Sequence, residues 1–192
     1  MSVPYQIDGI SGDGTESNPY LVRNIDEILS CIAVTDAYVK LVSDIYCKND
    51  EKYKNTVAFK FDVQCKRFYA DDAKYIYGLK ISGGSLKYGA FMSAVANSEI
   101  ENIHFIGTIF YRQYIDTETQ GGYNDYDFMF DDTTTVRNCT FQLNVFPHAY
   151  CRATGLIKGG IVERCAFVYK YTDYVKTYNS YTSTITIRYN FI

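Results

Sequence analysis

The chain has 192 residues, about the length of one domain, and 47% of them are hydrophobic, which excludes a disordered chain. Its 19 basic and 22 acidic residues give a net charge of −3, so it lacks the positive charge that binding to nucleic acid requires. No apolar run is long enough for a transmembrane helix, and the N-terminal residues do not have the pattern of a secretion signal. We therefore expect a protein that is made in the cytoplasm and binds neither nucleic acid nor membrane.

The N-terminal quarter predicts two strands with a short helix between them. A glycine-rich turn leads into a strand at 20–22, where Tyr, Leu and Val follow one another. Asn24 is a favourable helix N-cap, and the apolar spacing after it predicts a helix over 25–33. Alternation then predicts a strand over 37–45.

The middle and the end of the chain predict further strands. Residues 46–56 are polar and charged, which indicates an exposed loop. Strands are expected over 57–63 and near 76–81. Alternation over 184–192 predicts a last strand that closes the fold. The 20 Tyr and 12 Phe support this reading, because aromatic residues favour strands.

Three segments of the C-terminal half repeat one pattern: 100–105, 136–141 and 162–167. Each reads apolar, polar, Asn or Arg, apolar or Cys, variable, Phe, and they lie 36 and 26 residues apart. A repeat of this length is typical of a solenoid, in which each rung buries its apolar face against the next. Stacking in register predicts three inward rows: Ile100, Val136 and Val162; Ile103, Cys139 and Cys165; and Phe105, Phe141 and Phe167.

The six cysteines contain no Cys-x-x-Cys pair, so we expect no zinc site and interpret them as buried, reduced thiols. Cys139 and Cys165 are expected side by side in adjacent rungs, either as stacked thiols or as a disulfide. His104 is expected to point outward, because Phe105 next to it points inward.

Two motifs resemble right-handed parallel β-helix proteins, which occur on bacterial surfaces and in bacteriophage particles. The rung motif over 136–141 is one, and the opening segment is the other, through Gly12, Gly14, Thr15, Pro19, Tyr20, Leu21 and Val22. The resemblance covers 1–45 and about 95–192, and leaves the rungs of 46–94 without support. It implies an all-β chain that forms one domain over 1–192, a right-handed parallel β-helix with one short N-terminal capping helix. It implies no single activity, because this fold hosts many.

An acidic, tyrosine-flanked stretch is the candidate binding site, expected on or beside a loop that lengthens the 36-residue repeat. It is formed by Tyr123, Asp125, Tyr126, Asp127, Asp131 and Asp132. The carboxylates are compatible with a solvated loop, with Ca²⁺ binding or with an acid/base pair that cleaves sugars. The EF-hand pattern is absent, and we expect no catalytic set, no metal site and no cofactor.

We therefore expect a non-enzymatic structural or interaction component of a bacteriophage particle, such as a fibre, decoration or tail-associated protein. Its partners would be other virion proteins, further copies of itself in an oligomer such as a trimer, and a surface glycan. The first alternative is a glycan lyase or hydrolase that acts on the host surface. The second is a bacterial surface adhesin module.

Overall fold

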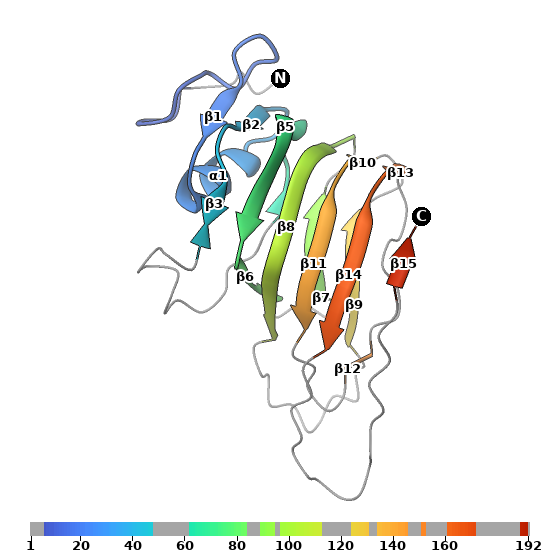
Figure 1. Cartoon of the computed structure of the whole chain (residues 1–192). Helices are drawn as coiled ribbons and strands as arrows, with labels where there is room; N and C mark the ends of the chain where they lie inside the picture. Colours follow the sequence, from blue (N-terminus) through green and yellow to red (C-terminus); the bar gives the residue numbers. More distant parts are fainter. Residues whose placement is uncertain are drawn as a thin grey trace, which may run out of the picture.

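The computed structural model consists mostly of strands, with one helix in the part of the chain that it describes (Figure 1). The prediction of an all-β chain is thereby confirmed. The described residues are 6–47, 62–83, 89–94, 97–112, 124–130, 134–145, 151–152, 161–171 and 189–191.

Among the described residues, eleven strands form one large sheet. Its main path is β1 (Tyr20–Val22), β2 (Tyr38–Leu41), β5 (Arg67–Tyr77), β8 (Glu99–Arg112), β11 (Thr140–Val145), β14 (Ala166–Tyr171) and β15 (Tyr189–Phe191). The flanking strands are β3 (Ile45–Tyr46), β6 (Lys80–Gly83), β10 (Thr135–Arg137) and β13 (Ile161–Glu163). All their pairings are parallel except that of β15, which runs antiparallel to β14.

A second, four-stranded sheet lies behind the first in Figure 1. Its order is β12 (Cys151–Arg152), β9 (Asn124–Phe130), β7 (Gly89–Ala94) and β4 (Asp62–Val63), and its pairings are also parallel. The chain visits the two sheets alternately, because β4, β7, β9 and β12 each lie between successive strands of the large sheet. Each passage through the second sheet supplies the crossover that parallel neighbours require.

The repeat segments pair in the predicted register. Val136 lies opposite both Ile100 and Val162. Phe141 likewise lies opposite both Phe105 and Phe167. Ile100, Phe105, Val136 and Phe141 are fully buried, and the Phe105 and Phe141 rings stack with centroids 5.4 Å apart. The first and third predicted rows are therefore confirmed as backbone ladders, and the side chain of Phe167 lies outside the described part. Ile103, Cys139 and Cys165 of the remaining row are all buried, but no pairing of the described strands aligns them with one another.

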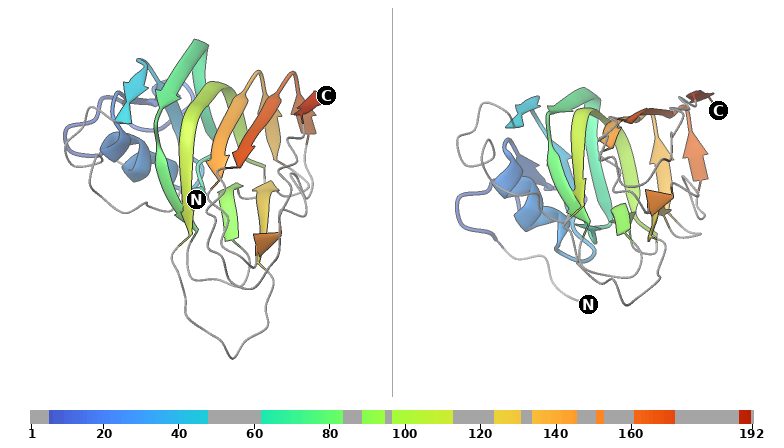
Figure 2. Two further views of the ribbon diagram at one scale, coloured as in Figure 1. Left: turned by 60° about the horizontal axis from the view of Figure 1, so that its bottom comes forward. Right: turned by 90° about the horizontal axis from the view of Figure 1, so that it is seen from below.

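The helix α1 (Ile25–Ile32) caps the first strands, at the opposite end of the large sheet from the C-terminus (Figure 2). The Asn24 side chain accepts a hydrogen bond from the Glu27 N–H at 2.9 Å, as predicted for an N-cap. One face of the helix is buried, through Ile25, Ile28, Cys31 and Ile32. The helix ends one residue earlier than expected.

The N-terminal turn requires glycine at two positions. Gly12 has φ +97, and a Cβ there would lie 2.0 Å from the Pro19 carbonyl oxygen. Gly14 has φ +80, and a Cβ there would lie 2.5 Å from the Tyr20 ring. Both positions therefore exclude a larger residue.

Several predicted strands have different bounds in the structure. The single strand expected over 37–45 is divided into β2 and β3, and the one near 76–81 is divided between the end of β5 and β6. Of the strand expected over 57–63, only β4 is described. Of the loop expected over 46–56, Tyr46 belongs to β3, Cys47 is buried, and the rest lies outside the described residues.

One further expectation is wrong. The last strand was expected as a closing rung, but β15 runs antiparallel to β14, so it is not another parallel repeat. Alternation shows which residues share a face but carries no information on strand direction. Asp125 and Asp127, which were expected on or beside a loop, lie within strand β9, whose sequence NDYDFMF alternates with period two despite its charges.

Candidate functional site

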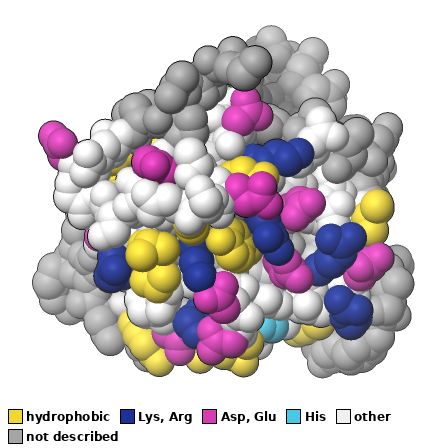
Figure 3. Space-filling view, turned by 90° about the horizontal axis from the view of Figure 1, so that it is seen from above, with side chains coloured by type: hydrophobic (Ala, Val, Ile, Leu, Met, Phe, Trp, Pro, Cys, Tyr) yellow, Lys and Arg dark blue, Asp and Glu magenta, His cyan; other side chains and the backbone are white. Residues whose placement is uncertain are grey.

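The outward face of the large sheet carries a row of charged side chains. In β8 the residues beside buried Ile100 are Glu99 and Glu101, and strand alternation turns both outward. Register places Arg67 of β5 opposite Glu99. It places Arg137 of β10 opposite Glu101 of β8. Charges of opposite sign therefore meet across neighbouring strands, and Figure 3 shows Lys, Arg, Asp and Glu side chains intermingled on this face.

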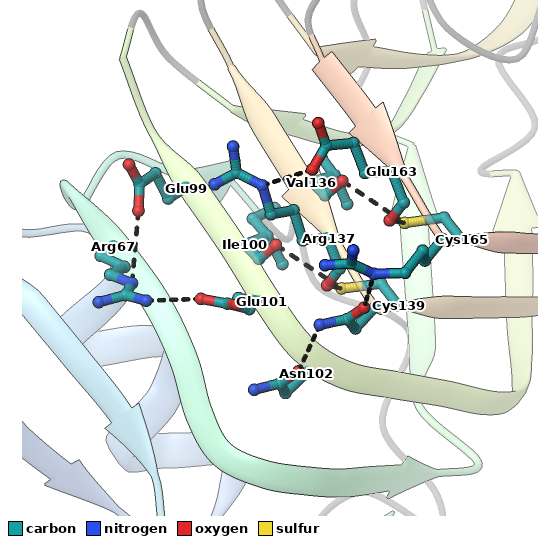
Figure 4. A network of polar contacts seen from close by, with 12 residues as sticks. Arg67, Glu99, Ile100, Glu101, Asn102, Val136, Arg137, Cys139, Glu163 and Cys165 are labelled. Carbon is teal, nitrogen blue, oxygen red and sulfur yellow. Dashed lines mark hydrogen bonds and ion pairs between the residues drawn. The ribbon is translucent and has the colours of Figure 1, made fainter.

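Arginines engage the carboxylates of this charged row (Figure 4). Arg67 forms ion pairs with Glu99, 3.4 Å from its Nε, and with Glu101 through Nη2. The Arg137 Nε donates to Glu163 Oε2 at 2.8 Å. These side chains are between 24% and 46% exposed, so each pair alone contributes little to stability.

Arg137 holds its partner Glu163 in the charged form. The hydrogen bond from Arg137, then its charge, lowers the pKa of Glu163 below its ordinary value. Burial of Arg67 lowers its pKa. The hydrogen bond to Glu101 and the charges of Glu101 and Glu99 outweigh burial, so the pKa of Arg67 is raised above its ordinary value. A carboxylate held ionised can accept a hydrogen bond or a cation but is a poor proton donor.

A second row on the outward face is aromatic. The Tyr46 and Tyr77 rings stack with centroids 4.8 Å apart, and Tyr75 stacks on Tyr77 at 5.7 Å. Tyr75 also stacks on His104, at 4.8 Å. The Nδ1 atom of His104 lies 3.0 Å from the Thr140 hydroxyl, which extends the row to β11. The interplanar angles are 24° or less, so the ring faces cover one another and leave their edges to solvent.

Burial adjusts two groups of this aromatic row. Desolvation lowers the pKa of His104, which therefore stays neutral more readily than an exposed histidine. Desolvation, followed by the charges of Tyr46, Asp44 and Tyr75, raises the pKa of Tyr77, so its hydroxyl remains a hydrogen-bond donor. Tyr46 is the last ring of the row in the described part of the chain, and it is 49% exposed. The row is suited to packing and hydrogen bonding.

A third row crosses the sheet through side-chain amides. Asn102 donates through Nδ2 to the Ala70 carbonyl at 2.8 Å. Asn138 donates through Nδ2 to Asn102 Oδ1 at 3.0 Å, and Arg164 donates through Nε to Asn138 Oδ1 at 2.6 Å (Figure 4). The repeat motif therefore places one polar group of each segment in contact with the next.

The part of the predicted acidic site that the structure describes lies in a different sheet from these rows. Asp125, Tyr126 and Asp127 lie in β9 of the four-stranded sheet, where Asp125 is opposite Arg152 in the backbone register. Tyr123, Asp131 and Asp132 lie outside the described residues. The predicted binding site therefore stays a prediction.

The cysteines whose side chains the structure describes are buried, and Cys31, Cys65, Cys139 and Cys165 carry free thiols. Burial raises the pKa of Cys31 and of Cys65 to about 12, so both remain thiols. Among the described residues, no three His, Cys, Asp or Glu side chains gather as metal ligands. No helix in the same part of the chain has the length and apolar character to cross a membrane.

Sequence reasoning placed His104 outward but missed the charged and aromatic rows. The sequence does show that Tyr75 and Tyr77 share one face of a strand. They form a row only because the strand register places Tyr77 opposite Tyr46 and Tyr75 opposite His104. Comparison of the chain with protein-family models, with curated proteins and with solved structures finds no match in any of the three. The fold and the side chains therefore carry the functional interpretation.

Proposed function

We propose that this chain is a non-catalytic structural and interaction protein whose two parallel sheets wind as a right-handed β-helix. The observation that carries the proposal is the repeated return to one register: β5, β8, β11 and β14 pair in order, and the strands between them pair in order in the second sheet. A coil of this kind buries a continuous core and presents its outer side chains at fixed spacing.

The outward rows support a structural role. Their side chains contact one another from strand to strand, as ion pairs in the charged row and as stacked rings in the aromatic row. The carboxylate of Glu163 is held ionised by Arg137, whereas a general acid needs a raised pKa. Such a surface suits lateral contacts with other proteins, because its charges and tyrosine edges are fixed in place.

The particle to which the protein would belong follows from the resemblance of its opening segment and repeat motif to β-helix proteins of bacteriophages. We propose that it is a fibre, decoration or tail-associated component, assembled as a homo-oligomer with other virion proteins. Its location would be the virion.

Immunogold labelling tests this role. An antibody raised against the purified chain is expected to label phage particles released from the bacterium that encodes it, and sedimentation of the pure chain is expected to give an oligomer mass. Label confined to the envelope of uninfected cells would instead support an adhesin. A monomer in sedimentation, with unlabelled particles, would contradict the proposal.

A glycan assay tests the enzymatic alternative. The purified chain is incubated with capsular and cell-wall glycans, and new reducing ends and unsaturated sugars are measured. We expect no turnover by the wild type. Turnover that is lost in Asp127→Asn and retained in Asp71→Asn, an exposed carboxylate outside the acidic stretch, would overturn the structural role.

A further inference from the structure

The two cysteines of the repeat motif lie at equivalent places on neighbouring strands. Each follows a residue in the left-handed conformation, Asn138 or Arg164, both with φ 52. Each immediately precedes a paired residue, because Thr140 lies opposite Ala166. The Ala166 N–H donates to the Cys139 carbonyl at 2.9 Å, so the two backbones are in direct contact.

This placement meets the distance requirement of a disulfide. Neighbouring strands are about 4.8 Å apart, and the Cα atoms of bonded cysteines are about 4.4–6.8 Å apart. Both thiols lie on the interior side, with Cys139 1% and Cys165 7% exposed. Each cysteine is the residue immediately before a strand, β11 or β14. The hydrogen bonds of the sheet therefore do not fix the distance between the two side chains, which can move together to form a bond.

The two sulfur atoms have equivalent surroundings in successive repeats, because each lies near the carbonyl two residues before it and near the matching carbonyl of the preceding strand (Figure 4). The Cys139 Sγ lies 3.0 Å from the Arg137 carbonyl oxygen and 3.7 Å from that of Ile100. The Cys165 Sγ lies 3.2 Å from the Glu163 carbonyl oxygen and 3.5 Å from that of Val136.

The thiols differ in acidity. Burial raises the pKa of Cys139, so it remains a thiol. The hydrogen bond from Cys139, which outweighs burial, lowers the pKa of Cys165 below its ordinary value. A cysteine that forms thiolate readily, beside a second thiol, is the arrangement that supports oxidation to a disulfide.

We propose that Cys139 and Cys165 form an oxidisable pair that a peroxide converts into a disulfide linking β11 to β14. The Cys165 thiolate attacks one peroxide oxygen, the O–O bond breaks, and hydroxide leaves as the sulfenic acid forms. The Cys139 sulfur then attacks the sulfenic sulfur, the S–S bond forms, and the sulfenic oxygen leaves as water with the thiol proton. In total, two thiols are oxidised and hydrogen peroxide is reduced to two waters.

The bond would stabilise the last parallel strand pair of the large sheet. Strand β14 pairs with β11 on one side and with the short antiparallel β15 on the other, as far as the structure describes them. A covalent link closes a loop of roughly two dozen residues in the unfolded chain, which disfavours unfolding. The inference does not depend on the proposed virion role, because it rests on the two strands alone.

Peptide mapping after peroxide treatment tests the proposal. The folded wild-type chain is treated with a small excess of hydrogen peroxide, alkylated, digested and analysed by mass spectrometry. We expect a cross-linked Cys139–Cys165 peptide about 2 Da lighter than the two reduced peptides together. The melting temperature of the oxidised protein is expected to rise by about 5–10 °C and to return on reduction.

Cys31 and Cys65 provide a matched internal control, because both are buried and the pKa of each is raised to about 12. They should remain reduced at the same dose, and Cys65→Ser should leave the Cys139–Cys165 cross-link unchanged. Cys165→Ser should abolish the rise in melting temperature. Two results with the wild-type chain would overturn the proposal. One is oxidation of Cys165 to sulfinic acid without a cross-link, and the other is a cross-link that forms only in denaturant.

Discussion

The backbone conformation at the third position of the repeat motif favours asparagine. Asn102 and Asn138 have φ 59 and 52, and Arg164 occupies the same position with φ 52. Asparagine enters the left-handed region more readily than other residues with a side chain. The same side chains form the amide row across the sheet, so one residue type satisfies both the turn and the contact between segments.

Substitution of Asn138 separates these two contributions. Asn138→Ala is expected to lower the free energy of unfolding by about 2–3 kcal/mol, through left-handed strain and lost hydrogen bonds. Asn138→Gly keeps the backbone conformation and is expected to lose only about 1 kcal/mol. Urea titration measures both values. Equal losses in the two variants would show that the left-handed backbone is not the reason for this residue.

His104 is expected to make stability depend on pH. Burial lowers its pKa in the folded chain, so the unfolded chain binds the proton first, at a pKa of about 6.5. Its contribution is therefore complete above about pH 6.5 and is lost as the pH falls through that value toward the folded pKa. Urea titrations at pH 7.5 and 5.5 should show the loss. His104→Phe, which keeps a ring against Tyr75 but does not titrate, should lose less between these two pH values.

At the scale of the strands, the inward phenylalanines dominate the packing between repeats. Phe141 is fully buried, and its ring lies 5.4 Å from that of Phe105 on the neighbouring strand. A buried aromatic ring that stacks in this way contributes through its area and through the ring contact.

Truncation of Phe141 should therefore be costly. Phe141→Ala is expected to lower the free energy of unfolding by about 3–5 kcal/mol, because it leaves a cavity between β8 and β11. Tyr46→Ala is the control: this ring is 49% exposed at the end of the aromatic row, and its loss should cost about 1 kcal/mol or less. Chemical denaturation compares them. Similar costs for both would place the Phe141 ring outside the core.

The sequence allowed prediction of the elements whose signals are local. The helix was predicted from Asn24 and the apolar spacing after it, and the register of the repeats was predicted from their shared pattern. Strand β5 was mostly missed, because its pairing with β8 shifts between Tyr69 and Lys74. The bulge inserts Asp71 and Asp72, which interrupt the alternation.

The outward rows were not predictable because they depend on alignment between distant segments. Tyr77 contacts Tyr46 through the pairing of β3 with β5, and Arg67 contacts Glu101 through the pairing of β5 with β8. Neither pairing has a sequence motif, since the repeat pattern begins only at Ile100. A period-two pattern shows which residues share a face, whereas register determines which residues touch.

At the scale of the whole molecule, the strands of the large sheet differ in how many neighbouring elements pack against them. Strand β8 pairs with β5, β6, β10 and β11, so it lies inside the stack. At the N-terminal end the helix α1 packs on β1 and β2 with a buried apolar face. At the C-terminal end the short β15 covers β14. In a fold where each repeat contacts only its neighbours, such ends open more easily than the centre.

Hydrogen exchange should therefore form a gradient along the large sheet. Amide protons of β8 are expected to exchange most slowly, those of β1 and β2 faster, and those of β14 and β15 fastest. The reason is that the helix α1 covers the N-terminal end of the sheet better than the short strand β15 covers the C-terminal end. Exchange followed by mass spectrometry of the peptides measures this order. Ile28→Ala, which truncates a fully buried side chain of α1, should speed exchange in β1 and β2 and leave β14 unchanged. A uniform acceleration would mean that the molecule opens as one unit rather than repeat by repeat.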